Sequence, residues 1–204
     1  MSSPYLSHQV DRLPALISSL EKQHAPVATM EFMNLGMMGD WQVALSSLRW
    51  GFKQPNLVWE DFTQTMTPSG GLHASKGELT TSLQWRLTER GGNVFTGLFE
   101  VLADYEVQQT GAMVCELKGH RLLPAGGKVP TDPVNLVQDL QRVMTPTIFD
   151  PSGLSWETAY LDADIRIMKV GGTDKLSGVR NVFIRKPYTE AGLAALEACL
   201  ETSD

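Results

Sequence analysis

The residue types that most often carry catalysis or bind metals are scattered through this 204-residue sequence. The four histidines, at positions 8, 24, 73 and 120, are isolated, and none has the HxxxH or HExxH spacing of a zinc site. The two cysteines, Cys115 and Cys199, belong to no CxxC or Cys/His cluster, and no GxSxG motif occurs. The sequence therefore predicts no catalytic residues, no metal site and no enzyme.

One polar row could still carry chemistry. Asp162, Asp164 and Arg166 are two residues apart, so in a strand over 161–167 their side chains would share one face. Such a row could form a two-carboxylate site, but we favour an arginine clamped by its neighbouring aspartates. We expect Arg166 to bridge Asp164, Asp162 or a carbonyl near Trp41, and so to hold the two ends of the folded domain together.

The elements that would position these residues are mostly strands. From Leu79 to Thr88 apolar and polar side chains alternate without error, which is typical of a half-buried strand. Glycine pairs at 70–71, 91–92 and 171–172 stand between alternating segments, as tight hairpin turns require. Shorter alternating runs occur at 41–45, 95–101, 113–117, 161–167 and 182–184.

These runs predict seven to nine short antiparallel strands, which must hide their edges. They can close into a barrel of about eight strands or stack as a two-sheet sandwich, and we expect the barrel. A closed barrel requires the first strand to pair with the last. The predicted fold class is therefore mainly β with accessory helices.

Helical periodicity predicts three accessory segments. An N-terminal helical segment covers 1–38, where apolar residues recur at spacings of three and four and Pro14 should kink or split the helix. A helix inserted at 132–145 can begin with Thr131 or Asp132 as its cap. Its expected apolar stripe is Val134, Val137, Leu140 and Met144. A C-terminal segment, 188–204, contains a further amphipathic helix at 190–200, and the barrel domain spans 39–187.

Aromatic residues on the regular apolar strand faces suggest a binding interior. In a closed barrel of eight strands these faces point inward, where the space is either filled by side chains or holds one small ligand. An apolar cavity would suit a hydrophobic molecule. Trp41 is expected to close one end of such a cavity. The candidate inner wall consists of Leu83, Trp85, Phe95, Phe99 and Met113.

Charge and hydropathy exclude other partners. Lys and Arg total 17 against 23 Asp and Glu, which gives a net charge of −6, and no basic run occurs. Nucleic-acid binding, which depends on phosphate neutralisation, is therefore not expected. No apolar run approaches the length of a transmembrane helix, and no signal or transit peptide is visible.

The C-terminal hairpin carries a family resemblance. The segment 160–167, YLDADIRI, followed by 181–185, NVFIR, resembles the end of the plastid lipid-associated protein (PAP/fibrillin) family, with its YLDxDLRI and FVxxR pattern. The segment 35–43, LGMMGDWQV, is similar to the opening of that family's first barrel strand. The resemblance covers roughly 35–186. It marks Tyr160, Asp162, Asp164 and Arg166 as structural motif residues.

The resemblance implies a lipocalin-like antiparallel β-barrel at the periphery of plastid or cyanobacterial thylakoids. It also implies binding or stabilisation of carotenoids, quinones or other lipids, and no further cofactor. We therefore expect non-enzymatic binding of an apolar small molecule at a photosynthetic membrane surface. Two alternatives stay open: an assembly protein of a photosynthetic complex with a filled barrel, and a calycin-like protein that handles tetrapyrroles such as bilins.

Overall fold

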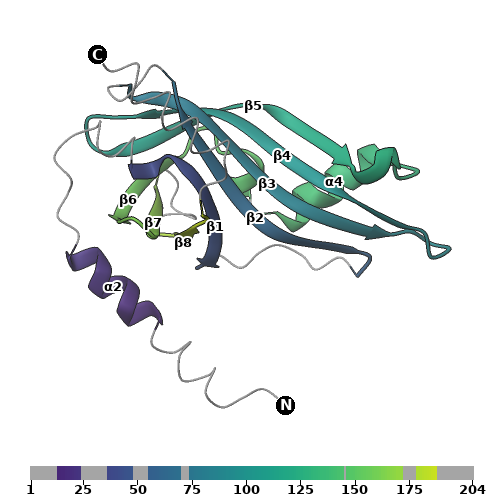
Figure 1. Cartoon of the computed structure of the whole chain (residues 1–204), viewed down its shortest axis with the longest axis horizontal. Helices are drawn as coiled ribbons and strands as arrows, with labels where there is room; N and C mark the ends of the chain where they lie inside the picture. Colours follow the sequence, from purple (N-terminus) through teal and green to yellow (C-terminus); the bar gives the residue numbers. More distant parts are fainter. Residues whose placement is uncertain are drawn as a thin grey trace, which may run out of the picture.

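The chain folds into a closed antiparallel barrel (Figure 1). The computed structural model describes residues 13–23, 36–47, 55–69, 74–144, 146–171 and 178–187. Within these ranges each strand pairs with the next along the chain, and β1 pairs with β8. The strands are β1 (Gly39–Ser46), β2 (Leu57–Pro68), β3 (Lys76–Thr88), β4 (Val94–Val107), β5 (Ala112–Pro124), β6 (Ser155–Leu161), β7 (Ile165–Gly171) and β8 (Arg180–Arg185).

The pairing of β1 with β8 confirms the predicted barrel over the sandwich. Trp41 stands opposite Arg185 and Val43 opposite Phe183, so the first and last strands share a ladder of backbone hydrogen bonds. Closure removes both sheet edges, which would otherwise expose unpaired backbone groups. The architecture is that of a lipocalin-like, up-and-down barrel.

Unequal strand lengths shape the molecule. Strands β2 to β5 have 12 to 14 residues, whereas β1 and β6 to β8 have six to eight. Because each residue adds about 3.3 Å, the long strands project beyond the short ones, as Figure 1 shows. Helix α4 (Pro133–Val143) packs against this projecting part, and its buried side chains belong to the same core as the barrel interior.

Strand β3 follows the predicted alternation along its whole length. Its apolar side chains are buried inside the barrel, while the intervening polar residues lie on the outer face. Opposite Trp85 on β4 stands Gly97, where a Cβ would lie 2.5 Å from the indole ring. The absence of a side chain at Gly97 therefore lets the Trp85 ring lie flat across the neighbouring strand.

The inserted helix is confirmed, but its expected apolar stripe is partly wrong. Asp132 caps α4 by accepting a hydrogen bond from the backbone N–H of Asn135 at 2.9 Å. Val134 is 67% exposed, because this first-turn position points away from the sheet. The buried face consists of Leu136, Leu140 and Val143, with Met144 buried just after the helix and Val137 partly buried.

The other accessory elements are short. The 3-10 turn η1 (Ala125–Gly127) precedes α4, and α5 (Pro146–Phe149) follows it. Helix α2 (Leu13–Gln23) is the described part of the N-terminal segment, and Pro14 is its second residue. The rest of segment 1–38 up to residue 35, including the expected kink, and the helix at 190–200 lie outside the described residues.

Helix α2 is attached to the barrel through the carboxylate of Glu21. Glu21 accepts hydrogen bonds from Arg180 of β8, at 2.6 Å to Nε and 3.1 Å to Nη2, and Lys169 of β7 lies 4.0 Å away. The hydrogen bond from Arg180 lowers the pKa of Glu21 below its ordinary value. No helix of the described residues has the length and apolar character needed to span a bilayer.

Candidate functional site in the barrel interior

The predicted strand over 161–167 is instead a hairpin. Strand β6 ends at Leu161 and β7 begins at Ile165, so Asp162 and Asp164 lie in the turn between them. Asp162 builds this turn, because its Oδ1 accepts from the backbone N–H groups of Asp164 at 2.8 Å and Ile165 at 2.6 Å. Its Oδ2 accepts from the Tyr160 hydroxyl at 2.7 Å.

The hairpin turns Arg166 to the opposite side from the one expected. Its side chain enters the barrel and is 0% exposed, while both aspartates are exposed at the turn. The expected bridges from Arg166 to Asp162 or Asp164 are therefore wrong. The physical reason is that the turn at 162–164 contains no glycine or proline. The alternation of apolar and polar residues therefore continues through it, and the sequence pattern does not reveal that the chain reverses there.

Inside the barrel, neutral groups surround Arg166. Its Nη2 donates to Oε1 of Gln64 at 2.7 Å, and its Nη1 contacts the Met66 sulfur at 2.6 Å. The guanidinium lies 4.3 Å from the ring centroid of Phe183 and 5.1 Å from that of Trp41, within range of cation–π attraction. These contacts position the group, but none of them carries a negative charge.

The charge of Arg166 is therefore uncompensated among the described residues. Burial, aided by the nearby charge of Arg185, lowers the pKa of Arg166 to about 9, so the group is still a cation at neutral pH. Within the described ranges no carboxylate forms a salt bridge with it. Burial raises the pKa of the neighbouring Cys115 thiol to about 12, so no thiolate is present to serve as a counterion.

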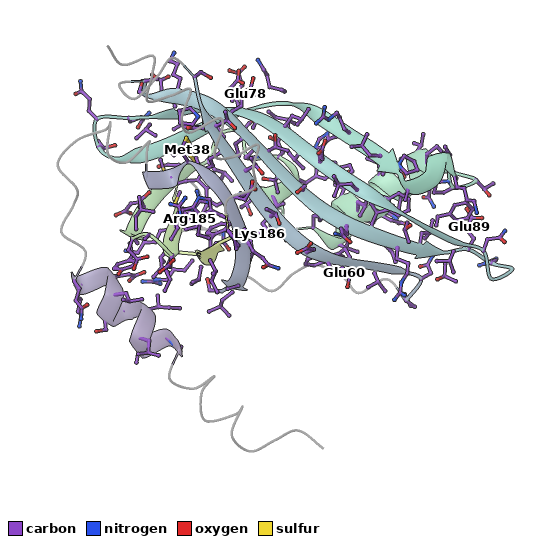
Figure 2. All side chains as sticks on the ribbon, in the orientation of Figure 1. Met38, Glu60, Glu78, Glu89, Arg185 and Lys186 are labelled. Atoms are coloured by element: carbon purple, nitrogen blue, oxygen red, sulfur yellow. The ribbon has the colours of Figure 1, made fainter. Side chains whose placement is uncertain are left out.

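The clamp expected of Arg166 is made by Arg185. Arg185 lies at the same end of the barrel as Met38 (Figure 2) and donates to the carbonyls of Met38 and Gly36, both at 2.6 Å. Its Nε donates to the Ala163 carbonyl at 2.6 Å. The guanidinium also stacks over Trp41, 4.1 Å from the ring centroid. Arg185 thus joins β8 to the start of β1 and to the β6–β7 turn.

The predicted wall residues come together on the inner surface. Trp41, Leu83, Trp85, Phe99 and Met113 belong to one core cluster and are each at most 2% exposed. Phe95, the sixth predicted wall residue, is partly buried and packs against the same cluster. Their side chains are packed together with little accessible surface between them.

Three buried polar atoms of the described residues have no hydrogen-bond partner, and all three are donors. They are Nε1 of Trp85, Nε1 of Trp156 and Nε of Arg166. Native proteins satisfy nearly all buried polar groups, and each orphan costs about 1–3 kcal/mol. Among the described residues, every buried side-chain polar atom that lacks a partner is therefore a donor.

Sequence reasoning missed Gln64 and Trp156. Gln64 follows Phe62 and precedes Met66 at spacings of two, so a polar residue stands in the apolar phase of β2. Its Nε2 donates to Thr81 Oγ1 at 3.4 Å on the neighbouring strand. The signal in the sequence was a polar residue at a position of β2 where the side chains on the same face are apolar. Its role can be interpreted only once Arg166 is known to lie against it.

We expect the loss of the Arg166 charge to be tolerated by the fold. Arg166→Met together with Gln64→Leu removes the unpaired cation and the amide that would otherwise lose its donor. Apolar replacement of a buried charged group is often neutral or stabilising by about 1–4 kcal/mol. Chemical denaturation should therefore give the double variant a free energy of unfolding equal to or above wild type. A loss of several kcal/mol would identify Arg166 as a structural clamp.

Searches for similar proteins supply no identity. No model of a known protein family matches the chain, and no curated protein matches it. Among the described residues no group of three or more His, Cys, Asp or Glu side chains could hold a metal ion. The chemistry of the interior is therefore the basis on which a function can be argued.

Proposed function

We propose that this protein binds an apolar small molecule, such as a carotenoid, a quinone or another lipid, inside its barrel without chemical conversion. We further propose that it works at the surface of a photosynthetic membrane, as the PAP/fibrillin resemblance implies. The observation that carries the proposal is the interior itself, which combines an aromatic wall with buried donors that lack acceptors among the described residues. Unsatisfied donors are rare in a native core, and a polar group of a bound ligand would supply the acceptors.

The interior also contains side chains that can yield to a ligand. Met37, Met66, Met113 and Met168 are all at most 2% exposed, and they come from four different parts of the barrel wall and its entry. Methionine has three rotatable bonds and a polarisable sulfur, so it adapts to irregular shapes. The side chains of a methionine-rich interior can therefore rearrange around a ligand more readily than those of an interior built from β-branched residues.

An exposed apolar tip supports contact with a membrane. The tip comprises Val94, Val129 and Val134, which are 55%, 56% and 67% exposed. Glu89, labelled at this end of the molecule in Figure 2, accepts from the N–H and hydroxyl of Thr131 at 2.8 and 3.0 Å. This contact holds the loop before α4 against the β3–β4 turn, so the three valines gather at one end.

Basic side chains stand beside the apolar tip. Arg90 lies in the β3–β4 turn and Lys128 immediately precedes Val129, and both are exposed. Valines that enter the headgroup region and cations that attract anionic lipids together favour a peripheral membrane contact.

Vesicle flotation tests the membrane contact. Val94→Asp with Val134→Asp should reduce the fraction of protein that floats with anionic lipid vesicles at least about fivefold, because each charge opposes burial of the tip. Ile184→Asp is the matched control, since Ile184 is also half-exposed but lies on β8. Equal flotation of wild type and the double variant would contradict a contact through the tip.

Solvent extraction tests the ligand itself. The protein is purified without detergent, extracted with organic solvent, and the extract is identified by mass spectrometry and compared with that of an unrelated protein from the same preparation. One apolar compound per barrel would support the proposal. A clean extract, with no change in melting temperature on adding carotenoid, quinone or fatty acid, would contradict it.

The close packing of the wall residues favours one second candidate function. Side chains with almost no accessible surface suit a filled barrel, whose working surface would be an outer element such as α4. An assembly protein of this kind would give the clean extract described above. It would also lose its protein partner when exposed residues of α4 are changed.

A further inference from the structure

We propose that Arg166 is the receptor for an anionic head group, so that the barrel selects an amphiphile with a single carboxylate and an apolar body. This inference rests on the proposed function and adds to it the chemical class of the ligand. It starts from the one charged side chain that the described chain buries completely.

A buried cation without an anion is an unstable arrangement in a region of low dielectric constant. Among the described residues Arg166 has neutral acceptors only, an amide oxygen of Gln64 and a thioether of Met66. Thioether sulfur is a weak acceptor, and the Nε–H of Arg166 has no acceptor in the part of the chain that the structure describes. A carboxylate on the edge that Nε shares with Nη2 would satisfy the free Nε–H and neutralise the charge.

The side chains around Arg166 can make room for a carboxylate. Met66 and Met168 lie on the strands that carry Gln64 and Arg166, and both side chains are flexible. Gln64 stays in place, because its other end donates to Thr81. The rings of Trp41 and Phe183 hold the guanidinium from its faces and leave its edge for in-plane hydrogen bonds.

The count of charges favours a carboxylate over a phosphate. One guanidinium balances one negative charge, whereas a phosphate monoester carries nearly two at neutral pH. The second cation at this end, Arg185, already donates to the carbonyls of Gly36, Met38 and Ala163. It would have to give up the barrel closure to reach a phosphate.

The packed apolar side chains of the inner wall mark the path that a ligand tail would open away from Arg166. Thr81, which bonds to Gln64, is followed on the same inward face by Leu83, Trp85 and Leu87. These positions extend over about 20 Å of strand. Such a path suits the acyl chain of a long fatty acid, with its carboxylate at Arg166 and its tail directed toward α4.

The experiment compares two probes that differ only in the head group. Dodecanoic acid and dodecan-1-ol are titrated into delipidated full-length protein, and binding is followed by tryptophan fluorescence, since three tryptophans lie in the core. Wild type should bind the acid about tenfold or more tighter than the alcohol, as expected for a charge-assisted pair. Arg166→Met should abolish this preference while alcohol binding changes less than about twofold.

A matched control separates this site from surface charge. Arg121 is an exposed arginine that pairs with Glu100 on the outer face, so Arg121→Met should leave both affinities unchanged. If wild type binds acid and alcohol equally, the role of Arg166 is overturned while the proposed function stands. If neither probe binds, and no quinone or carotenoid binds either, the proposed function fails and the inference fails with it.

The test does not depend on whether Arg166→Met folds. The comparison of acid with alcohol in wild type needs no substitution, and adding the methyl ester of dodecanoic acid removes the charge at constant length. Methyl dodecanoate should bind like the alcohol. Ester binding as tight as that of the acid would overturn the proposal.

Discussion

Arg185→Met is expected to destabilise the barrel by about 3–5 kcal/mol, since it removes three charge-assisted hydrogen bonds from a partly buried site where water replaces part of what is lost. The carbonyls of Gly36, Met38 and Ala163 each lose their arginine donor. The stacking of the guanidinium on Trp41 disappears as well. The free energy of unfolding, measured by chemical denaturation, is the quantity to compare.

Arg180→Met is the control for this prediction. Arg180 also lies on β8 and also makes short contacts, but with the carboxylate of Glu21 at the surface. Surface ion pairs contribute about 0–1 kcal/mol. A loss for Arg180→Met as large as that for Arg185→Met would show that any arginine on this strand matters equally, and would contradict the assignment of barrel closure to Arg185.

Trp41→Ala should cost about 3–5 kcal/mol, the range found when a large buried aromatic side chain is truncated. Trp41 is 0% exposed and lies between the guanidinium groups of Arg166 and Arg185. Its Nε1 donates to the Met37 carbonyl at 2.7 Å, so truncation also leaves that carbonyl without its donor. The melting temperature and the denaturation midpoint should both fall.

Trp41→Phe separates the contribution of the aromatic ring to stability from that of the hydrogen bond to Met37. Phenylalanine keeps an aromatic face for both arginines but cannot donate to Met37, so its cost should be well below that of alanine. If Trp41→Phe costs as much as Trp41→Ala, the hydrogen bond rather than the ring is the main contribution. If neither variant loses stability, Trp41 does not close the barrel end.

Much of the fold could be predicted because it is encoded in local periodicity. The alternation at 79–88 specifies which side chains of β3 face inward, since successive side chains in a strand point to opposite sides. The cap and periodic pattern at 132–145 similarly specify a helix. The need to hide strand edges allowed either a barrel or a sandwich; we expected the barrel, and the β1–β8 pairing confirms it.

The candidate site was only half predictable. The inward orientation of Trp41, Leu83 and Trp85 follows from the strand pattern, and the structure places them in one core. The role of Arg166 does not follow from the pattern, because the position of the turn decides whether its side chain points into or out of the barrel. Asp162 makes that turn with its own side chain, through hydrogen bonds to the backbone that a period of two does not register.

The sequence by itself determined the mainly β class, the helix before β6, and the aromatic wall, because each depends on a repeating relation between neighbouring residues. Only the tertiary structure decided which arginine closes the barrel and which lies unpaired inside it. Trp41 and Gln64 pair across the consecutive strands β1 and β2, whereas Arg166 on β7 lies 102 residues beyond Gln64 in the sequence. Their meeting is set by strand register and barrel closure, and these long-range pairings leave no period in the sequence.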